Sequence, residues 1–355
     1  MTEKIDIKSL NESELCEIIT ELGIPKFRAK QIWLQLFQKL KTDFADMSDI
    51  PKSLVPILNE HFEIRTARVL EKLVSKLDGT EKYLFSLHDD SVIESVLMRY
   101  EHGNSVCVST QVGCRQGCAF CASTKNGFVR SLTAGEILGQ IEAITREHMG
   151  EDGFRVDNIV LMGIGEPLDN YDNVVKFLRL VNDKNGLNIG YRHISLSTCG
   201  LVPEIKRLAK EDFPITLSIS LHAPNDEIRN TMMPVNRRYN IDELLSACRE
   251  YQAHTGRRIS FEYALIDGVN DTTEHAKELA TRLKGLLCHV NLIPVNPIRE
   301  KNFKKTTKNN LILFTNALNN SKINATVRRK LGADIDAACG QLRNKRMKEA
   351  SSKED

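Results

Sequence analysis

The chain has 355 residues, of which 41% are hydrophobic and 27% charged, and its formal net charge is +2. These values are typical of a globular protein of about two domains, and the near-zero charge argues against indiscriminate binding of polyanions. No apolar run approaches the roughly 18 residues of a membrane span, and the start MTEKIDIKSL is typical of neither a signal nor a transit peptide. We therefore expect a cytoplasmic protein without a membrane partner.

The first predicted domain, residues 1–65, is a small helical accessory domain. Asn11 and Glu14 form a capping-box pattern, and apolar residues then recur at helical spacing up to Gly23. After a Gly-x-Pro turn, a second helix carries three cations that would either contact phosphates or form an ordinary solvated face: Lys26, Arg28 and Lys30.

The pattern changes after residue 65. Residues 66–104 alternate with period two around a turn at Asp78 and Gly79, which predicts a short antiparallel sheet extension. In residues 105–343, strands then alternate with helices predicted at 133–149, 171–183, 203–210, 241–254, 273–285 and 308–319, before a last strand near INATVR. Six βα units predict an α/β partial barrel that binds ligands at the carboxyl ends of its strands, followed by a polar tail at 344–355.

The most distinctive local pattern is QVGCRQGCAFCA, in which Cys114, Cys118 and Cys121 fall within eight residues. An odd number of cysteines, nine, in a chain without an export signal favours metal or redox chemistry over a disulfide scaffold. A [4Fe-4S] cluster usually has four thiolate ligands, so three cysteines would leave one iron open to a substrate or cofactor. A structural zinc site is the alternative, but no second ligand pair follows at zinc-finger spacing. We therefore favour the cluster.

The Cys-x3-Cys-x2-Cys loop after the first barrel strand resembles the radical S-adenosylmethionine (SAM) superfamily. Phe120 matches the aromatic residue common before the third cysteine, and MGIGEP, which contains Gly165 and Glu166, resembles the segment that contacts the cofactor's amino group. The resemblance implies a (β/α)6-type partial barrel in which the open iron binds SAM and the reduced cluster cleaves it to a 5′-deoxyadenosyl radical.

Longer stretches narrow the resemblance. SVCVSTQVGC, LSTCG, SLHAPNDEIR, MPVNRRYNI, IDGVND, NLIPVNP and GADIDAACGQL occur in that order. Together they resemble the dual-specificity ribosomal and transfer RNA adenine C2-methyltransferases, from the N-terminal helices to about residue 343. The resemblance implies as substrates 23S ribosomal RNA in the peptidyl transferase region and the adenine 3′ of the anticodon in transfer RNA.

The same resemblance implies three catalytic residues. One SAM methylates Cys339 and a second generates the radical that activates this methyl group, so that its carbon adds to C2 of adenine. Cys107 then attacks the sulfur of Cys339, releasing the product from the covalent adduct as a disulfide forms, and Glu94 accepts the proton from C2. Spacing alone would favour an outward-facing Glu94 and a core role for Cys107. Cys16, Cys199, Cys248 and Cys288 are interpreted as packing residues.

The residues that the resemblance implies for SAM binding follow predicted strand ends: Gly165, Glu166, Ser197, Ser220, Leu221, His222 and Asn296. We assign His222 no catalysis, because a lone histidine after a strand is more often a hydrogen-bonding residue. Further candidate RNA contacts are basic residues that could equally be solvated: Arg299, Lys301, Lys304, Lys305, Lys308, Arg328, Arg329 and Lys330.

Three other functions remain as alternatives. The related antibiotic-resistance enzymes methylate C8 of the same ribosomal adenine, although Pro167 favours the C2 family. A non-catalytic RNA-binding protein with a structural metal is a second alternative, and a radical enzyme that acts on protein is a third. For the favoured enzyme we expect a monomer that receives electrons from a donor such as flavodoxin or ferredoxin.

Overall fold

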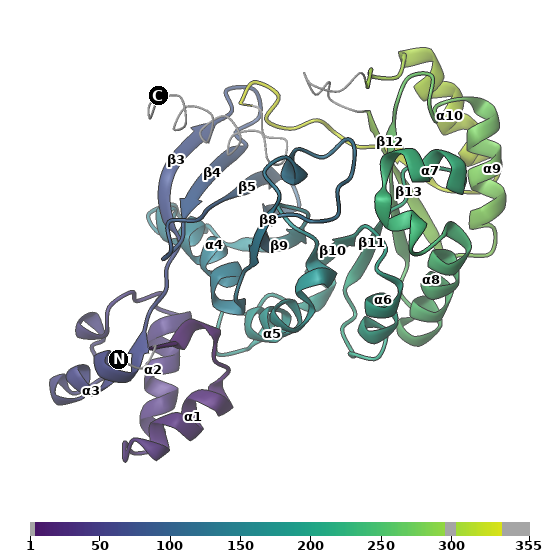
Figure 1. Ribbon diagram of the computed structural model, residues 1–355. Helices are drawn as coiled ribbons and strands as arrows, with labels where there is room; N and C mark the ends of the chain where they lie inside the picture. Colours follow the sequence, from purple (N-terminus) through teal and green to yellow (C-terminus); the bar gives the residue numbers. More distant parts are fainter. Residues whose placement is uncertain (1–3, 295–302, 336–355) are drawn as a thin grey trace.

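The computed structural model describes residues 4–294 and 303–335, and Figure 1 labels its α-helices and many of its strands. An N-terminal helical unit, purple in Figure 1, stands apart at one end of the molecule. It contains β1 (Ile5–Asp6), η1 (Ile7–Ser9), α1 (Glu12–Glu21), α2 (Phe27–Phe37), η2 (Phe44–Asp46), η3 (Lys52–Leu54), α3 (Val55–His61) and β2 (Phe62–Glu63). Parallel pairing of β1 with β2 brings the two ends of this unit together.

The main body is one ten-stranded sheet in the order β14-β13-β12-β11-β10-β9-β6-β5-β4-β3. Its strands are β3 (Arg68–Val74), β4 (Glu81–Ser86), β5 (Val92–Tyr100), β6 (Gly103–Cys107), β9 (Val156–Leu161), β10 (Ile194–Thr198), β11 (Thr216–Ser220), β12 (Ile259–Leu265), β13 (Cys288–Pro294) and β14 (Ala325–Val327). The pairs from β6 to β14 are parallel, and those from β3 to β6 are antiparallel. The antiparallel extension therefore continues the barrel sheet.

Helices connect the parallel strands: α4 (Ala134–Glu147), α5 (Tyr171–Asn182), α6 (Val202–Leu208), α7 (Asp226–Met232), α8 (Ile241–Thr255), α9 (Thr273–Leu283) and α10 (Lys308–Asn320). The longer helices each present an apolar face; α4, for example, buries Ile137, Ile141 and Ile144 completely. This packing leaves the carboxyl ends of the strands available for loops that build a site.

The predicted fold class is confirmed, and so are several local predictions. Asn11 and Glu14 form the expected capping box, and the six helices predicted between the strands end within two residues of their predicted limits. Sequence periodicity missed the short helix α7 and a separate hairpin of β7 (Gln111–Gly113) and β8 (Phe128–Ser131). Both are too short to show a period. Among the described residues, no helix is long and apolar enough to cross a membrane.

Candidate active site

The three clustered cysteines lie in the loop between β7 and β8. Gly113 has φ +79°, and a Cβ there would collide with the carbonyl oxygen of Gly127. That same carbonyl accepts a hydrogen bond from the amide of Cys114 at 3.2 Å, and the amide of Ala119 donates to the carbonyl of Met232 at 2.7 Å. The loop is therefore fixed at its start by a backbone contact that needs a glycine at position 113, and further along by the separate bond of Ala119.

The thiols of this loop lie close enough to influence each other. Burial raises the pKa of Cys114 to about 12 and that of Cys118 well above its usual range, and Cys121 and Glu166 raise both further. A cationic iron cluster would favour the thiolate forms and so oppose these raised pKa values, because metal binding replaces the thiol protons. Three thiols on one constrained loop are the donor set that a site-open [4Fe-4S] cluster needs.

No group of three or more His, Cys, Asp or Glu side chains that could hold a metal ion occurs within residues 4–294 and 303–335. A cubane distributes its thiolate ligands over separate irons, so its ligands need not converge on one ion.

Glu166 lies beside this loop, after β9. Gly165 has φ +111°, and any Cβ there would approach Gln111 to 2.7 Å. The Glu166 carboxylate is buried and accepts hydrogen bonds from the amides of Leu168 (3.1 Å) and Cys199 (2.7 Å). Burial raises the pKa of Glu166, and the bonds from Cys199 and Leu168 oppose the rise. The structure thus fixes this carboxylate between the predicted cluster loop and the end of β10.

His222 joins the same region from the end of β11. Its ring makes an edge contact with Phe120, with 4.7 Å between the centroids, and its Nδ1 accepts a hydrogen bond from the amide of Ala264 at 2.9 Å. Burial and the nearby charge of Arg229 lower the pKa of His222 to about 3. His222 is therefore a neutral ring with its proton on Nε2, positioned against the cysteine loop.

The remaining residues predicted to contact SAM are distributed over neighbouring strand ends. Ser197 and Ser220 are half-buried on β10 and β11, and Leu221 is buried just after β11. Asn296 lies outside the described residues. The amides of Leu221 and His222 both donate to the carbonyl of Glu262 on β12, which aligns this part of the edge.

Arg229 is an organising residue that sequence reasoning missed. This fully buried side chain on α7 donates to the carbonyls of Cys199, Ser220 and Leu221 at 2.7–3.1 Å. It also donates to Asn236 at 2.8 Å. One guanidinium therefore forms hydrogen bonds to the carboxyl ends of both β10 and β11. The only sequence signal was its place in SLHAPNDEIR, where it resembles an ordinary helix cation.

Glu94 and Cys107 occupy a second part of the site, on β5 and β6. Cys107 pairs with Val96, two residues from Glu94, so their side chains share one face of the sheet. Glu94 is only 3% exposed and forms an ion pair with the fully buried Lys82 of β4 at 3.2 Å. Glu94 is therefore not the outward-facing residue that strand alternation alone would favour. Lys82 is a second residue that sequence reasoning missed.

Cys107 is half-buried at the carboxyl end of β6. Burial raises its pKa to about 11, and Glu94 adds to the rise, whereas Arg328, Lys82 and a hydrogen bond from the amide of Met162 favour the thiolate. Arg328 follows β14, an edge strand of the sheet, whereas Cys107 lies on the interior strand β6. The predicted partner, Cys339, lies outside the described residues.

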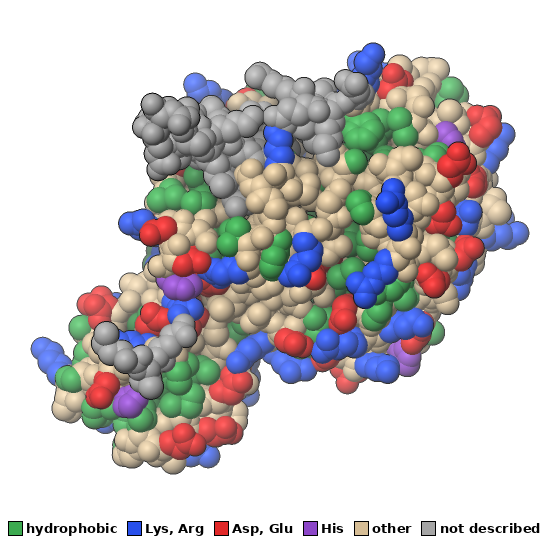
Figure 2. Space-filling view, viewed as in Figure 1, with side chains coloured by type: hydrophobic (Ala, Val, Ile, Leu, Met, Phe, Trp, Pro, Cys, Tyr) green, Lys and Arg blue, Asp and Glu red, His purple; other side chains and the backbone are tan. Residues whose placement is uncertain are grey.

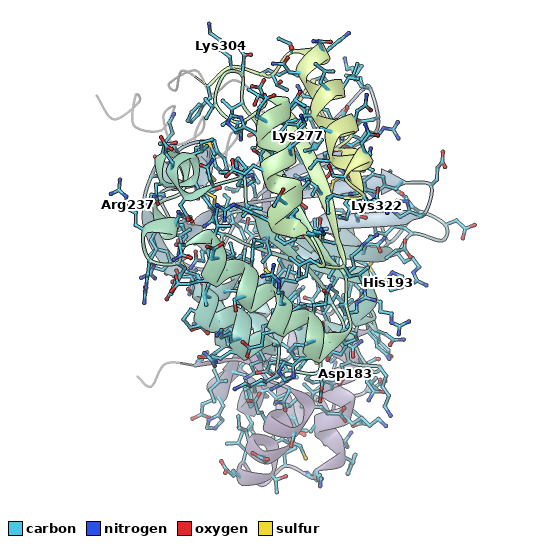
Figure 3. The ribbon with its side chains drawn as sticks, turned by 90° about the vertical axis from the view of Figure 1, so that its right-hand side faces the viewer. Asp183, His193, Arg237, Lys277, Lys304 and Lys322 are labelled. Atoms are coloured by element: carbon cyan, nitrogen blue, oxygen red, sulfur yellow. The ribbon has the colours of Figure 1, made fainter. Side chains whose placement is uncertain are left out.

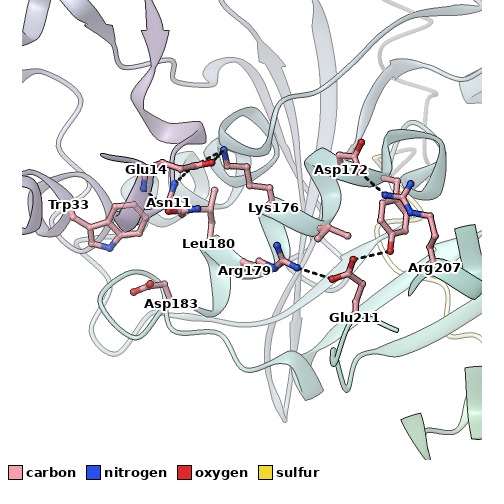
Figure 4. Close-up of a pocket in the computed structure, with 12 residues that line it drawn as sticks. Asn11, Glu14, Trp33, Asp172, Lys176, Arg179, Leu180, Asp183, Arg207 and Glu211 are labelled. Carbon is pink, nitrogen blue, oxygen red and sulfur yellow. Dashed lines mark hydrogen bonds and ion pairs between the residues drawn. The ribbon is translucent and has the colours of Figure 1, made fainter. Parts of the chain in front are cut away.

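A pocket of about 480 Å³ lies elsewhere, between α1, α2 and α5 (Figure 4). Its cations are paired with acids: Lys176 with Glu14, Arg179 with Glu211, and Arg207 with Asp172, all at 2.8–3.0 Å. None of the residues predicted for catalysis or cofactor binding lines it. The pocket is thus a feature of the contact between the N-terminal unit and the barrel.

Comparisons with known proteins agree with this architecture. Residues 108–280 match the model of the radical SAM superfamily, and residues 5–64 match the ribosomal RNA large subunit methyltransferase N-terminal domain. A crystal structure of a radical SAM methyltransferase from Sphaerobacter thermophilus superposes with a TM-score of 0.91 and 45% sequence identity, covering 95% of this chain and 98% of that chain.

Two curated proteins show the relationship over almost the full length. A protein of Lachnoclostridium phytofermentans is 53% identical, covering 97% of this chain and 95% of its own. One of Clostridium perfringens is 56% identical, covering 94% and 95% respectively. Both are named "Probable dual-specificity RNA methyltransferase RlmN". With this identity over nearly its whole length, the chain belongs to the RlmN family of dual-specificity RNA methyltransferases within the radical SAM superfamily.

Proposed function

We propose that this enzyme methylates C2 of adenine in 23S ribosomal RNA, in the peptidyl transferase region, and at the adenine 3′ of the anticodon in transfer RNA. Cys339 carries the methyl carbon, Cys107 releases the product and Glu94 accepts a proton. The observation that supports this assignment best is the shared face of Cys107 and Glu94, with cations from β4 and from the residue after β14 beside them.

Members of this superfamily use a [4Fe-4S] cluster and SAM, two per turnover in this family, which when bound supply the methyl group and the radical that activates it. Cys114, Cys118 and Cys121 would hold the cluster. Gly165, Glu166, Ser197, Ser220, Leu221, His222 and Asn296 would hold SAM. The buried Glu166, fixed by two backbone amides, is oriented to receive a cationic amino group.

The chemistry explains why two further thiols are useful. C2 of adenine is an electron-poor carbon that cannot attack a sulfonium methyl, so the new carbon must be held by the protein and later released. In release, the Cys107 thiolate attacks the sulfur of Cys339, so that the S–S bond forms and the S–C bond breaks with its electron pair on the methylene carbon. This carbon stays on the base and takes up a proton to become the methyl group, and the unpaired electron of the adduct leaves to a one-electron acceptor, which the cluster, when bound, would supply. Glu94 takes the proton from C2. Lys82 and Arg328 favour the Cys107 thiolate that this attack requires.

RNA would approach over basic side chains. Figure 2 shows Lys and Arg spread over one face with Asp and Glu between them, and Figure 3 shows Lys304 directed away from the chain. Lys304, Lys305 and Lys308 are exposed, as are Arg328, Arg329 and Lys330, whereas Arg299 and Lys301 lie outside the described residues. Charge reversal at Lys304 and Lys305 is expected to weaken RNA binding, measured by filter binding at fixed salt. Unchanged affinity would remove this loop from the interface.

The decisive experiment is anoxic turnover of the reduced, cluster-loaded enzyme with SAM and unmodified ribosomal or transfer RNA. A flavodoxin or ferredoxin is the expected electron donor, and the enzyme is expected to act as a monomer. Nucleoside digestion and chromatography then separate 2-methyladenosine from 8-methyladenosine. We expect 2-methyladenosine, absent with Cys339→Ala. An 8-methyladenosine product would instead favour the resistance family. If the cluster is active but neither methyladenosine forms, the proposal that RNA is the substrate is overturned.

Cys107→Ala provides a separate test of the release step. Without a resolving thiol, the RNA is expected to remain covalently attached to Cys339, as a species of reduced mobility in a denaturing gel that nuclease digestion removes. Formation of free methylated RNA at the wild-type rate would exclude Cys107 from the reaction.

A further inference from the structure

The chain after β14 links the two edges of the ten-stranded sheet. The amide of Arg328 still donates to Leu292 of β13 at 2.8 Å, as a sheet residue would. The chain then leaves β14, and its yellow trace in Figure 1 runs to the turn between β3 and β4 at the opposite edge. We call residues 328–335 the strap.

Three hydrogen bonds fasten the strap to this turn. The hydroxyl of Ser75 donates to Asp334 Oδ1 at 2.6 Å, and the amide of Lys76 donates to Asp334 Oδ2 at 2.9 Å. In the reverse direction, the amide of Gly332 donates to Asp78 Oδ2 at 2.9 Å. Each segment thus supplies one carboxylate to the other. We call these five residues the hairpin clamp.

The turn has its own bonds and does not depend on the strap for its shape. Ser75 Oγ accepts from the amides of Leu77 and Asp78 at 3.2 and 3.3 Å, and Asp78 Oδ1 accepts from the amide of Thr80 at 3.0 Å. Gly79 supplies the left-handed conformation, with φ +70°. The turn is therefore preorganised to bind the strap, which lowers the entropic cost of fixing the strap.

The clamp lies close in sequence to the proposed methyl carrier. Cys339 follows Asp334 by five residues, beyond the described part of the chain. Five extended residues reach at most about 17 Å. Without the clamp, the last residue fixed to the sheet would be Arg328, and the eleven residues to Cys339 would reach about 38 Å.

We propose that the hairpin clamp is a positioning device that raises the effective concentration of the Cys339 thiol at Cys107. This inference rests on the proposed function, in which the two thiols meet. The clamp residues touch no reacting atom; they act only by shortening the tether. The clamped turn lies near Cys107, because Lys82, which follows the turn, pairs with Val96, and Val96 pairs with Cys107, a separation of roughly 10 Å across two strand spacings. For an anchor within reach of Cys107, shortening the tether from eleven to five residues raises the effective concentration about threefold if the tether is a flexible coil and about tenfold if the reachable volume sets it.

The test measures the Cys107–Cys339 disulfide in the full-length, cluster-loaded protein, equilibrated anoxically with glutathione buffers. Oxidised glutathione accepts the two electrons and two protons of the thiols and becomes two molecules of reduced glutathione. Alkylation and peptide mass spectrometry give the equilibrium constant. We expect Asp334→Ala and Ser75→Ala each to lower this constant about threefold to tenfold. The kcat for methylation should fall with it, while the KM for RNA stays unchanged.

Two matched variants separate positioning from general damage to the turn. Ser75→Thr keeps the hydroxyl, and Lys76→Ala keeps the backbone amide that meets Asp334, so both should retain the wild-type constant. Thermal unfolding followed by circular dichroism checks that every variant is folded. An unchanged constant in folded Asp334→Ala overturns the clamp. A different result would overturn the proposed function together with the clamp. In that case the wild-type protein forms no such disulfide, and the Cys339→Ala variant still methylates RNA.

Discussion

Lys82 and Glu94 form an ion pair whose side chains are 0% and 3% exposed. Lys82→Met removes the ammonium group and leaves the Glu94 carboxylate buried beside an apolar chain. Loss of one member of a buried pair typically costs about 3 kcal/mol of folding free energy. We expect a decrease of this size in urea unfolding, because the carboxylate loses a charge partner in a low-dielectric site.

The double variant Lys82→Met/Glu94→Gln is the control for this prediction. Neutralising the carboxylate should recover part of the lost stability, so the two changes should not be additive. Additive losses in the double-mutant cycle would mean that the pair contributes no coupling.

His222 illustrates how burial decides a protonation state. Its pKa is lowered to about 3, mainly by burial, so the ring is neutral in the pH range around neutrality. We expect its ¹⁵N resonances to report a protonated Nε2 and an unprotonated Nδ1, without change from about pH 5 to 8, the range in which an unperturbed histidine titrates. His222→Asn assigns the signal. A titration in this range would contradict the hydrogen-bonding role.

At the scale of the element, the β7–β8 hairpin depends on Gly113. A Cβ at this position would collide with the Gly127 carbonyl, which accepts the amide of Cys114. Gly113→Ala should therefore displace the cysteine loop and lower the iron and sulfide content of anoxically purified protein severalfold.

Gly127→Ala is the matched control for Gly113→Ala. Gly127 has a similar φ of +67°, but a Cβ there meets nothing within 4 Å. The cost should be limited to backbone strain, about 1 kcal/mol, with near-normal cluster content. Equal cluster loss in both variants would show that the left-handed conformation, not the collision, is the sensitive feature.

At the scale of the whole molecule, one buried lysine joins the N-terminal unit to the barrel. Lys8 Nζ donates to Glu142 Oε1 of α4 at 2.6 Å and to the Leu36 carbonyl at 2.9 Å, and it lies 4.1 Å from the centroid of the Phe37 ring. Lys8→Met should leave the Glu142 charge buried at this contact. We expect faster hydrogen exchange in α1 and α2, with β9–β13 unchanged.

Lys39→Met is the comparison for Lys8→Met, because the pair of Lys39 with Asp49 is about half exposed and lies within the N-terminal unit. Exposed pairs contribute little, so exchange in α1 and α2 should remain close to that of the wild type. Similar exchange in both variants would show that Lys8 does not fasten the unit.

Short-range patterns in the sequence predicted many of the helices and strands. Helical spacing located the six barrel helices, period-two alternation located β3–β5, and Asn11 and Glu14 located the start of α1. The cysteine spacing and the MGIGEP segment predicted the superfamily, and the longer stretches predicted the methyltransferase family, both of which the comparisons confirm. Such signals are readable because the residues that create them are neighbours along the chain.

The alternation in β4 and β5 could not show that Lys82 and Glu94 are paired inside the sheet, because the side that becomes buried depends on what packs against it. In the same way, Arg229 appears as a surface helix residue until α7 folds against the ends of β10 and β11.

The sequence by itself thus determined the order of the main strands and helices and the family, and it supplied the prediction that Cys114, Cys118 and Cys121 are cluster ligands. Only the tertiary structure decided which charges are buried and which distant segments meet, as when Glu166 approaches the cysteine loop and Asp334 reaches Ser75. The reason is physical: local patterns reflect the geometry of helices and strands, whereas burial and pairing depend on packing between different elements, which join residues from twelve positions apart, as in Lys82 and Glu94, to 259 apart, as in Ser75 and Asp334.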